Sequence, residues 1–387
     1  MEEKSIHIVS FDVPYPPDYG GVIDVYFKCK SLKEIGMHVI LHCFEYGRGR
    51  PEQLQEIADQ VYYYPRKKSL FSFFSSLPFI VQTRNNPALL ENLLKDDAPV
   101  LFEGLHCCYF LQHPKLKSRC KLVRAHNVES EYYSGLAGVE NNFLKKLYFK
   151  TEARKLKNFE PTLKNADEIL AITRQDQVYF QKQYHKGVYL PVFASMNVEN
   201  KKREPGNYAL YHGNLSVAEN EFAVRFLVNE VWENDFPLKL IVAGKNPSPE
   251  FVKFLNAQKF EIQCLSNLSN QELNQLIRNA KINLLPAFQN TGIKLKLLNC
   301  LSNAGFCIAN SMMTDGTGLE KYCFMAENAS EWKAQIKKLA LQPENEEALK
   351  FQHAAIRKMF DGQQNARKIL EIIQQKNQSN LKSKLAD

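Results

Sequence analysis

Short apolar runs alternate with amphipathic helical patterns along the first half of the chain. The expected strands lie at 6–11, 38–44, 99–106, 121–127 and 166–173, and the expected helices at 20–36 and 141–166. Strands that are apolar along their whole length, rather than at every second position, are typical of parallel sheets covered by helices on both faces. This half therefore predicts an α/β domain built on a parallel sheet.

A second alternating series follows in the other half. The expected strands are 208–216, 238–244, 260–266, 281–287 and 306–310, and the expected helices are 217–232, 270–280 and 292–305. The segment between the two series, 195–207, is polar and charged and ends with Pro205 and Gly206, which is typical of a linker. We expect an acceptor domain at 1–195, a donor domain at 206–365, and a closing helix and tail at 366–387.

The fold class predicted from this pattern is α/β, with two Rossmann-like domains facing a central cleft. A length of 387 residues favours two domains over one. Ligands of such folds bind at the carboxyl ends of the strands, so polar residues at those ends are the first candidates for a site.

Composition narrows the class of protein. The nine cysteines show no CxxC spacing, which argues against a structural zinc site and a disulfide framework. The first residues lack a signal-peptide pattern, and no apolar segment is long enough to span a membrane. We expect a cytoplasmic protein, peripheral to the inner face of the cell membrane if it meets a membrane at all. The net charge of +8 suggests an anionic partner, but no motif indicates nucleic acid.

Polar residues follow the strands of the first half. Gly20 and Gly21 lie between the first strand and the first helix, where a ligand could approach the backbone; an ordinary tight turn is the alternative. The run Arg124, His126, Asn127 and Glu129 leaves a buried strand at the mouth of the sheet, and Glu103 and His106 leave its neighbour in the same way. Their spacing matches no standard metal-ligand pattern, so no metal site is predicted.

In the second half, Gly213 and Asn214 follow the first strand. Ser216 and Glu219 have the spacing of a capping box, which would explain those two residues but not Gly213 and Asn214.

The stretch NTGIKLKLLNCLSNAGFCIAN, 290–310, places two lysines at the start of an apolar helix. A lysine in a first turn is repelled by the positive end of the helix dipole. A bound diphosphate would compensate both the lysine charge and the dipole. Lys294 and Lys296 are two positions apart and should point to different sides of the helix. We expect one to face the ligand and the other to be solvated.

At these residues the chain resembles the GT-B glycosyltransferases of the family-4-like group, also called group 1, over nearly its whole length. The matching elements occur in the order 14–41, 124–133, 212–220, 240–244, 290–310 and 316–319. The resemblance implies a hexosyltransferase-type enzyme that moves a sugar from a nucleotide-sugar donor to a glycan or lipid-linked acceptor. It also implies retention of anomeric configuration, no cofactor and no required metal, and a place in surface polysaccharide or glycolipid biosynthesis.

The same resemblance implies roles for single residues. His126 would bind the donor sugar, and Lys296, with Lys294 as the alternate, would neutralise the diphosphate leaving group. The other donor-binding residues would be Gly20, Gly21, Gly213, Asn214, Thr291, Gly292 and Asn299.

The sequence also departs from this family. Thr291 and Asn299 stand where many members have two glutamates, and the region after Gly213 is acidic where a basic residue is common. A second hypothesis is therefore a catalytically inactive protein of the same fold that binds nucleotide sugars or assists assembly.

One basic and aromatic segment, 66–84, is a candidate for contact with an anionic membrane or a lipid-linked acceptor. Its alternative is a helix that faces the core.

Overall fold

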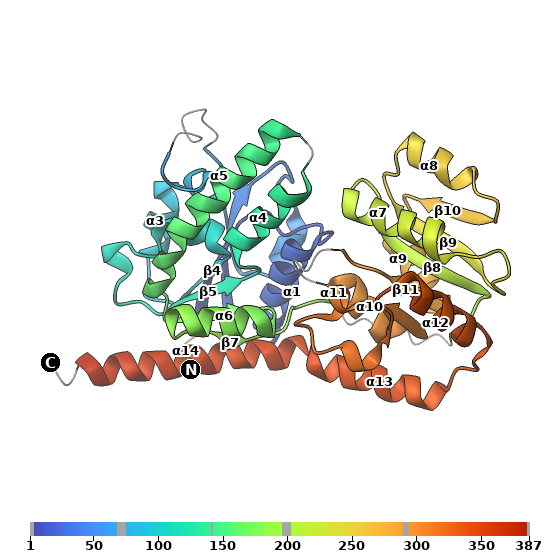
Figure 1. Cartoon of the computed structure of the whole chain (residues 1–387). Coiled ribbons are helices and arrows are strands. Elements are labelled where there is room, and N and C mark those ends of the chain that lie inside the picture. Colours follow the sequence, from blue (N-terminus) through green and yellow to red (C-terminus); the bar gives the residue numbers. More distant parts are fainter. Residues whose placement is uncertain (1–3, 68–74, 141, 196–202, 289–293, 385–387) are drawn as a thin grey trace. The chain divides into compact units, whose positions relative to one another are not determined.

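The computed structural model describes residues 4–67, 75–140, 142–195, 203–288 and 294–384 (Figure 1). The chain divides into two compact units, and each is described by itself. The first unit takes the described residues up to Ser195 and again from Phe360 onward, and the second unit takes those between, up to Met359.

The first unit is built on a seven-stranded parallel sheet with the strand order β3-β2-β1-β4-β5-β6-β7. Its strands are β1 Ser5–Ser10, β2 His38–Glu45, β3 Gln60–Pro65, β4 Val100–Glu103, β5 Lys121–Ala125, β6 Glu168–Ala171 and β7 Val188–Tyr189. The order reverses between β1 and β4, and a reversal of this kind is where α/β sheets bind ligands.

The helices of this unit cover both faces of the sheet. They are α1 Gly20–Glu34, α2 Phe79–Gln82, α3 Pro87–Leu93, α4 Glu129–Val139, α5 Phe143–Phe159, α6 Arg174–Tyr184 and α14 Gly362–Lys384, with short turns η1 Glu52–Glu56, η3 Leu105–Phe110, η4 Pro114–Leu116 and η5 Glu160–Asn165. Leu101 packs with Leu32 of α1 and Ile369 of α14, whereas its neighbour Phe102 packs with Leu156 of α5 and with α6. Alternate side chains of one strand therefore build the cores on opposite faces.

The second unit repeats the plan with a six-stranded parallel sheet in the order β10-β9-β8-β11-β12-β13. Its strands are β8 Tyr208–Asn214, β9 Lys239–Lys245, β10 Ile262–Ser266, β11 Ile282–Leu285, β12 Phe306–Ala309 and β13 Phe324–Met325. Its helices are α7 Ala218–Phe226, α8 Pro249–Asn256, α9 Asn270–Asn279, α10 Leu295–Asn303, α11 Ser311–Thr314, α12 Ala329–Leu341 and α13 Glu346–Met359, with short turns η6 Leu227–Val231 and η7 Glu320–Tyr322. Trp332 of α12 is buried in the core of this unit.

The predicted α/β class with two parallel sheets is confirmed. Three strands were not predicted: β7 and β13 are only two residues long, and β3 is an edge strand rich in tyrosine. The closing helix α14 begins at Gly362, earlier than expected, and packs against α1 of the first unit. In the described part of the chain, every helix is too short or too polar to cross a lipid bilayer.

Candidate functional sites

A buried cluster of charged side chains lies at the carboxyl ends of β4 and β5 in the first unit. Asp24 and Lys28 come from α1, Glu103 from the end of β4 and Arg124 from β5, and all four are fully buried. Lys28 Nζ donates to Asp24 Oδ2 at 2.8 Å and to Glu103 Oε1 at 2.6 Å. One ammonium therefore ties the first helix to the fourth strand.

Arg124 completes the neutralisation of Asp24. Its Nε and Nη2 donate to the two carboxylate oxygens of Asp24 at 3.0 and 2.9 Å. The same guanidinium also donates to the backbone oxygens of Leu190 and Pro191. Asp24 Oδ1 accepts a further bond from the backbone N–H of Phe193 at 2.8 Å. The predicted candidate Arg124 is thus part of the internal framework.

His126 lies at the open edge of this cluster, 7% exposed, with its Nε2 3.1 Å from Glu103 Oε2. Burial raises the pKa of Glu103, but Lys28 and His126 outweigh this effect and hold the pKa below its usual value. Because that carboxylate is ionised and accepts, His126 donates through Nε2, and in the neutral form of the ring Nδ1 is then the acceptor nitrogen. Nδ1 has no hydrogen-bond partner among the described residues. The cluster therefore fixes the orientation of the histidine and leaves one acceptor unused.

The sequence did not predict Asp24 or Lys28 as part of this cluster. A signal was present, since both residues fall on the apolar face of α1, beside the buried Val25, Cys29 and Leu32. A charged pair four positions apart on a core-facing stripe needs a partner inside the protein.

The same residues form a cluster that a metal ion could use. Among the described residues, the ligand atoms of Asp24, Glu103 and His126 lie within 4.8 Å of one another. Lys28 Nζ already bridges the two carboxylates and Arg124 holds both oxygens of Asp24. A metal would have to displace an ammonium from these oxygens, so the donor set fits the lysine better than a metal ion.

His106 and Glu129, two weaker candidates from the sequence, lie next to each other. His106 Nδ1 is 3.8 Å from Glu129 Oε1, and neither atom has a hydrogen-bond partner among the described residues. Burial raises the pKa of Glu129 to about 8, with Asp176 adding to the effect and Arg84 opposing it. Glu129 is therefore an uncharged acid near neutral pH.

The glycine pair of the first loop has a packing role. Gly20 is the first residue of α1, and a Cβ added to Gly21 would lie 2.5 Å from Cζ of Phe11. The Phe11 ring in turn contacts the rings of His106 and His126, with centroids 5.6 and 5.5 Å away. Gly21 is required so that Phe11 can reach the two histidines, and its predicted contact with donor phosphates stays a prediction.

The second unit brings five of its predicted or neighbouring residues together at the end of β8. Asn220 of α7 accepts from Tyr211 Oη at 3.0 Å and from Lys296 Nζ at 3.1 Å, and it donates to the backbone oxygen of Asn214 at 2.9 Å. A Cβ added to Gly213 would lie 3.1 Å from Cγ of Asn220. Gly213 therefore leaves room for the amide that holds Lys296, and Asn220 is a site residue that sequence reasoning missed.

Lys296 is in the first turn of α10 and Lys294 is its N-cap residue, and no acidic residue occupies that turn. Burial lowers the pKa of Lys296 to about 8; Lys294 contributes, while Glu219 opposes. Burial also lowers the pKa of Lys294, against Glu219 and Asp315. Both lysines are half-buried, and the expectation that one of them faces a ligand while the other is solvated stays a prediction.

The capping-box interpretation was also wrong. The N-cap of α7 is Val217, without a side-chain cap, so the helix begins one residue later than a box at Ser216 requires. Ser216 Oγ donates to Asn214 Oδ1 at 2.8 Å. The Asn214 side chain also accepts from the backbone N–H of Ser216 and so closes a local turn. A capping box does exist in this unit, between Ser269 and Glu272 at the start of α9.

Asn299, the expected ribose partner, is held by two other amides. Its Nδ2 donates to Asn274 Oδ1 at 3.0 Å, and its Oδ1 accepts from Asn303 Nδ2 at 3.0 Å. Its predicted contact with a nucleotide stays a prediction. Thr291 and Gly292, the two remaining candidates, lie outside the described residues.

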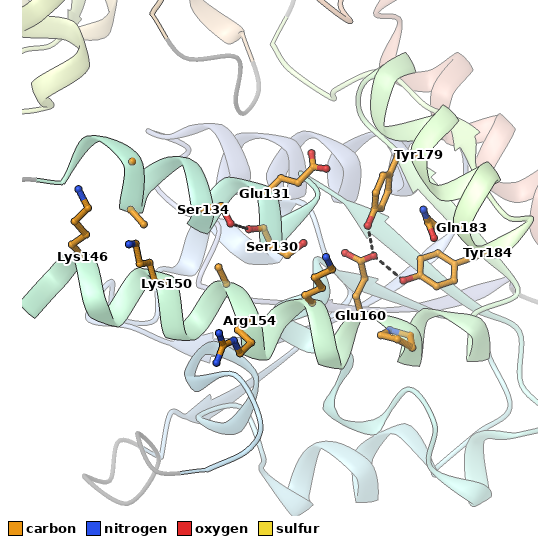
Figure 2. Close-up of a pocket in the computed structure, with 15 residues that line it drawn as sticks. Ser130, Glu131, Ser134, Lys146, Lys150, Arg154, Glu160, Tyr179, Gln183 and Tyr184 are labelled. Carbon is orange, nitrogen blue, oxygen red and sulfur yellow. Dashed lines mark hydrogen bonds between the residues drawn. The ribbon is translucent and has the colours of Figure 1, made fainter.

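A separate groove runs between α4, α5 and α6 in the first unit, with a volume of about 1040 Å³ (Figure 2). The side chains that line it are Ser130, Glu131, Ser134, Ala137, Gly138, Lys146, Lys150, Ala153, Arg154, Lys157, Glu160, Pro161, Tyr179, Gln183 and Tyr184. Tyr179 and Tyr184 both donate to Glu160 Oε1 at 2.7 Å and join α6 to the end of α5.

The segment 66–84, the predicted membrane candidate, is described only in part. Ile80, Val81 and Arg84 are buried, and Arg84 donates to the backbone oxygens of Phe11 and Ile80. The described part therefore follows the alternative, a segment that faces the core.

No protein-family model matches the chain. An uncharacterised 44.6 kDa protein of the cps region of Klebsiella pneumoniae is 27% identical to it over 329 residues, which cover 81% of this chain and 84% of that protein.

Matches to solved structures cover more of the chain than the match to this sequence relative does. The structure of TarM has a TM-score of 0.65 at 10% identity and covers 96% of this chain and 98% of its own. The Anabaena protein Alr3699/HepE, solved in complex with UDP and glucose, has a TM-score of 0.64 at 10% identity and covers 96% of this chain and 100% of its own. Both are GT-B glycosyltransferases, and the chain therefore has the GT-B fold, as its sequence predicted.

Proposed function

We propose that this protein is a retaining glycosyltransferase of the hexosyltransferase type. It moves a sugar from a nucleotide-sugar donor to a glycan or lipid-linked acceptor, and it acts in surface polysaccharide or glycolipid biosynthesis. The GT-B fold supports the reaction class. The relative in a cps region supports a role in capsule assembly.

The observation that carries this proposal is the pair of lysines at the start of α10. Two half-buried cations lie at the positive end of a helix dipole, and no carboxylate in that first turn neutralises their charge. Lys296 hydrogen-bonds a neutral amide rather than a carboxylate. An arrangement of this kind is stabilised by an anion, and a diphosphate leaving group is the anion that a nucleotide sugar supplies.

In this proposal the two lysines meet the electrostatic demand of the reaction. Negative charge builds on the diphosphate as the bond to the sugar loosens, and an ammonium placed there stabilises the transition state more than the ground state. Lys296 is the principal residue and Lys294 the alternate. The lysines supply the positive charge, so the proposed reaction requires no metal and no cofactor.

The first unit supplies the contact with the donor sugar. His126 is held by Glu103 through Nε2 and offers Nδ1 as an acceptor for a sugar hydroxyl. Gly20 and Gly21 bring the start of α1 toward the phosphates and acceptor, while Gly213, Asn214, Thr291, Gly292 and Asn299 complete the donor-binding residues.

A second candidate is a protein of this fold that binds nucleotide sugars without turnover. The observation in its favour is Asn299, whose amide is already bonded to Asn274 and Asn303. No carboxylate is available at that position to bind a ribose.

One experiment separates the two candidates. The purified protein is incubated with a panel of nucleotide sugars, and release of free nucleotide is followed with and without crude lipid acceptors. A glycosyltransferase releases nucleotide slowly without an acceptor and faster with one, and Lys296→Ala lowers both rates by about a hundred- to a thousandfold. Binding of a nucleotide sugar without any turnover supports the second candidate, and no binding at all contradicts both.

The proposed location is the cytoplasm, at the inner face of the cell membrane, where a lipid-linked acceptor would be met.

A further inference from the structure

Helix α5 presents an outward-facing stripe that changes character along its length. Phe143, Leu144 and Leu147 at its start are 75%, 73% and 52% exposed. Lys150 and Arg154 continue the same side of the helix, three to four positions apart, and are exposed as well. A single helix face thus begins apolar and ends cationic.

The groove described above lies beside the cationic part of this stripe; Phe143, Leu144 and Leu147 are not among its lining residues. Besides Glu131, the residues of α4 that line it are small: Ser130, Ser134, Ala137 and Gly138. Their size leaves room opposite the long side chains of α5, and Figure 2 shows Lys146, Lys150 and Arg154 following one another along that helix. The groove is large enough for the head group of a lipid.

The cations of the groove are not neutralised within the described part of the chain. Lys146, Lys150, Arg154 and Lys157 form no ion pair with another described residue, whereas Lys155 on the same helix is 3.1 Å from Glu152. The groove has fewer acidic residues than basic ones. Glu131 is exposed, and the buried Glu160 accepts from Tyr179 and Tyr184.

We propose that the surface formed by α4 and α5 docks on an anionic phospholipid membrane. The side chains of Phe143, Leu144 and Leu147 enter the apolar layer, and the four cations of the groove bind lipid phosphates. This inference deepens the proposed function and rests on it in one respect: a lipid-linked acceptor gives the enzyme a reason to sit on a membrane.

The combination of exposed apolar and cationic side chains on one helix face favours a membrane over a free phosphate or a nucleic acid. A soluble anion would satisfy the cations but leave three large apolar side chains in water at a cost proportional to their area. A lipid surface accommodates both parts of the stripe, because its phosphates and its hydrocarbon are adjacent. Each basic residue near such a surface strengthens binding by about fivefold.

The test is sedimentation of the full-length protein with vesicles, in two compositions: phosphatidylcholine alone, and an equal mixture of phosphatidylcholine and phosphatidylglycerol. We expect binding to the mixed vesicles only. Lys150→Gln/Arg154→Gln/Lys157→Gln should weaken it on the order of a hundredfold, and Phe143→Ser/Leu144→Ser/Leu147→Ser by at least roughly tenfold. All six side chains are exposed, so both variants should fold.

A matched control, Lys30→Gln/Lys115→Gln/Lys117→Gln, removes the same charge from exposed lysines elsewhere on this unit and should bind mixed vesicles nearly as wild type does. Inorganic diphosphate at concentrations that saturate the cations should not release the protein completely. The proposal is overturned if the wild type ignores mixed vesicles, or if the control weakens binding as much as the groove variant. Calorimetry with UDP tests the proposed function separately, since Lys296 lies in the other unit.

Discussion

Both units place charged side chains at the carboxyl ends of their strands, but they treat these charges differently. In the first unit, Lys28 and Arg124 are hydrogen-bonded to Asp24 and Glu103 in a fully buried network. In the second unit, Lys296 is bonded to a neutral amide, and the described carboxylates near it, Glu219 among them, make no hydrogen bond to it.

This difference distinguishes charged residues that hold the fold together from charged residues that can bind a ligand. A buried charge that is fully paired has no capacity left for a ligand, so the network around Asp24 positions His126 and holds the sheet to α1. A half-buried ammonium without a carboxylate partner is unstable on its own, and burial lowers its pKa accordingly. The first cluster is complete without a ligand, and in the proposed function an anion completes the second.

The largest effect is expected when the paired cluster is broken. Arg124→Met removes four hydrogen bonds and leaves the buried negative charge of Asp24 with less positive charge beside it. Unfolding free energy should fall by about 3–5 kcal/mol, measured by urea denaturation. Circular dichroism should report it, because both tryptophans, Trp232 and Trp332, lie in the second unit.

The control for that measurement is Arg50→Met. Arg50 pairs with Glu45 at 2.8 Å, but its side chain is 61% exposed, so the free energy of unfolding should stay close to that of the wild type. An Arg124→Met protein that is as stable as the Arg50→Met protein would contradict the framework role.

The next effect concerns the unpaired cluster, by which we mean Lys296, which has no hydrogen bond to a described carboxylate, together with Asn220, Tyr211 and Gly213. Lys296→Ala should lower turnover about a hundred- to a thousandfold, the range seen when one preorganised charge or donor to a developing anion is removed. Folding stability should change little, because the lysine is destabilised where it is. Lys294→Ala should cost less, and equal, near-wild-type rates for both variants would rule out the diphosphate assignment.

A smaller effect, a dependence of UDP affinity on pH, follows from the pKa of Lys296. The protonated form binds an anion, and with a pKa of about 8 the free protein loses that form as pH rises through 8. Affinity for UDP should therefore fall by up to about tenfold from pH 7 to pH 9, measured by calorimetry. Lys296→Arg stays protonated in this range and should abolish the dependence; a wild-type affinity that does not change with pH would show that Lys296 does not meet the diphosphate.

The sequence predicts this contrast only in part. The strands were found because parallel strands are apolar on both faces, and the β4 and β12 strands are buried at every position. Lys296 was found because a lysine in a first helical turn opposes the dipole, which is a local argument. Strands of two residues, such as β7, carry too few positions to show a pattern.

The paired network could not be predicted in the same way, because its bonds are long-range. Lys28 and Glu103 are 75 positions apart, and Asp24 and Arg124 are 100 apart. The capping box at Ser216 failed for a local reason: Asn214, only two residues away, accepts from the Ser216 backbone N–H and hydroxyl in a tight turn, and α7 begins one residue later. Spacing alone does not say whether such a turn or a helix cap forms at a serine.

The smallest effect should come from Gly213→Ala, which touches the unpaired cluster without removing a charge. The new Cβ would lie 3.1 Å from Cγ of Asn220, so the amide must shift by a few tenths of an ångström and weaken its bond to Lys296. The affinity for UDP should fall by about two- to fivefold, the equivalent of part of one hydrogen bond, while turnover at saturation stays near wild type. Gly138→Ala on α4, where the Cβ meets nothing within 4 Å, is the control and should leave UDP affinity unchanged. A loss larger than that of Lys296→Ala would mean that the turn at Gly213, rather than the lysine, makes the main contact with the nucleotide.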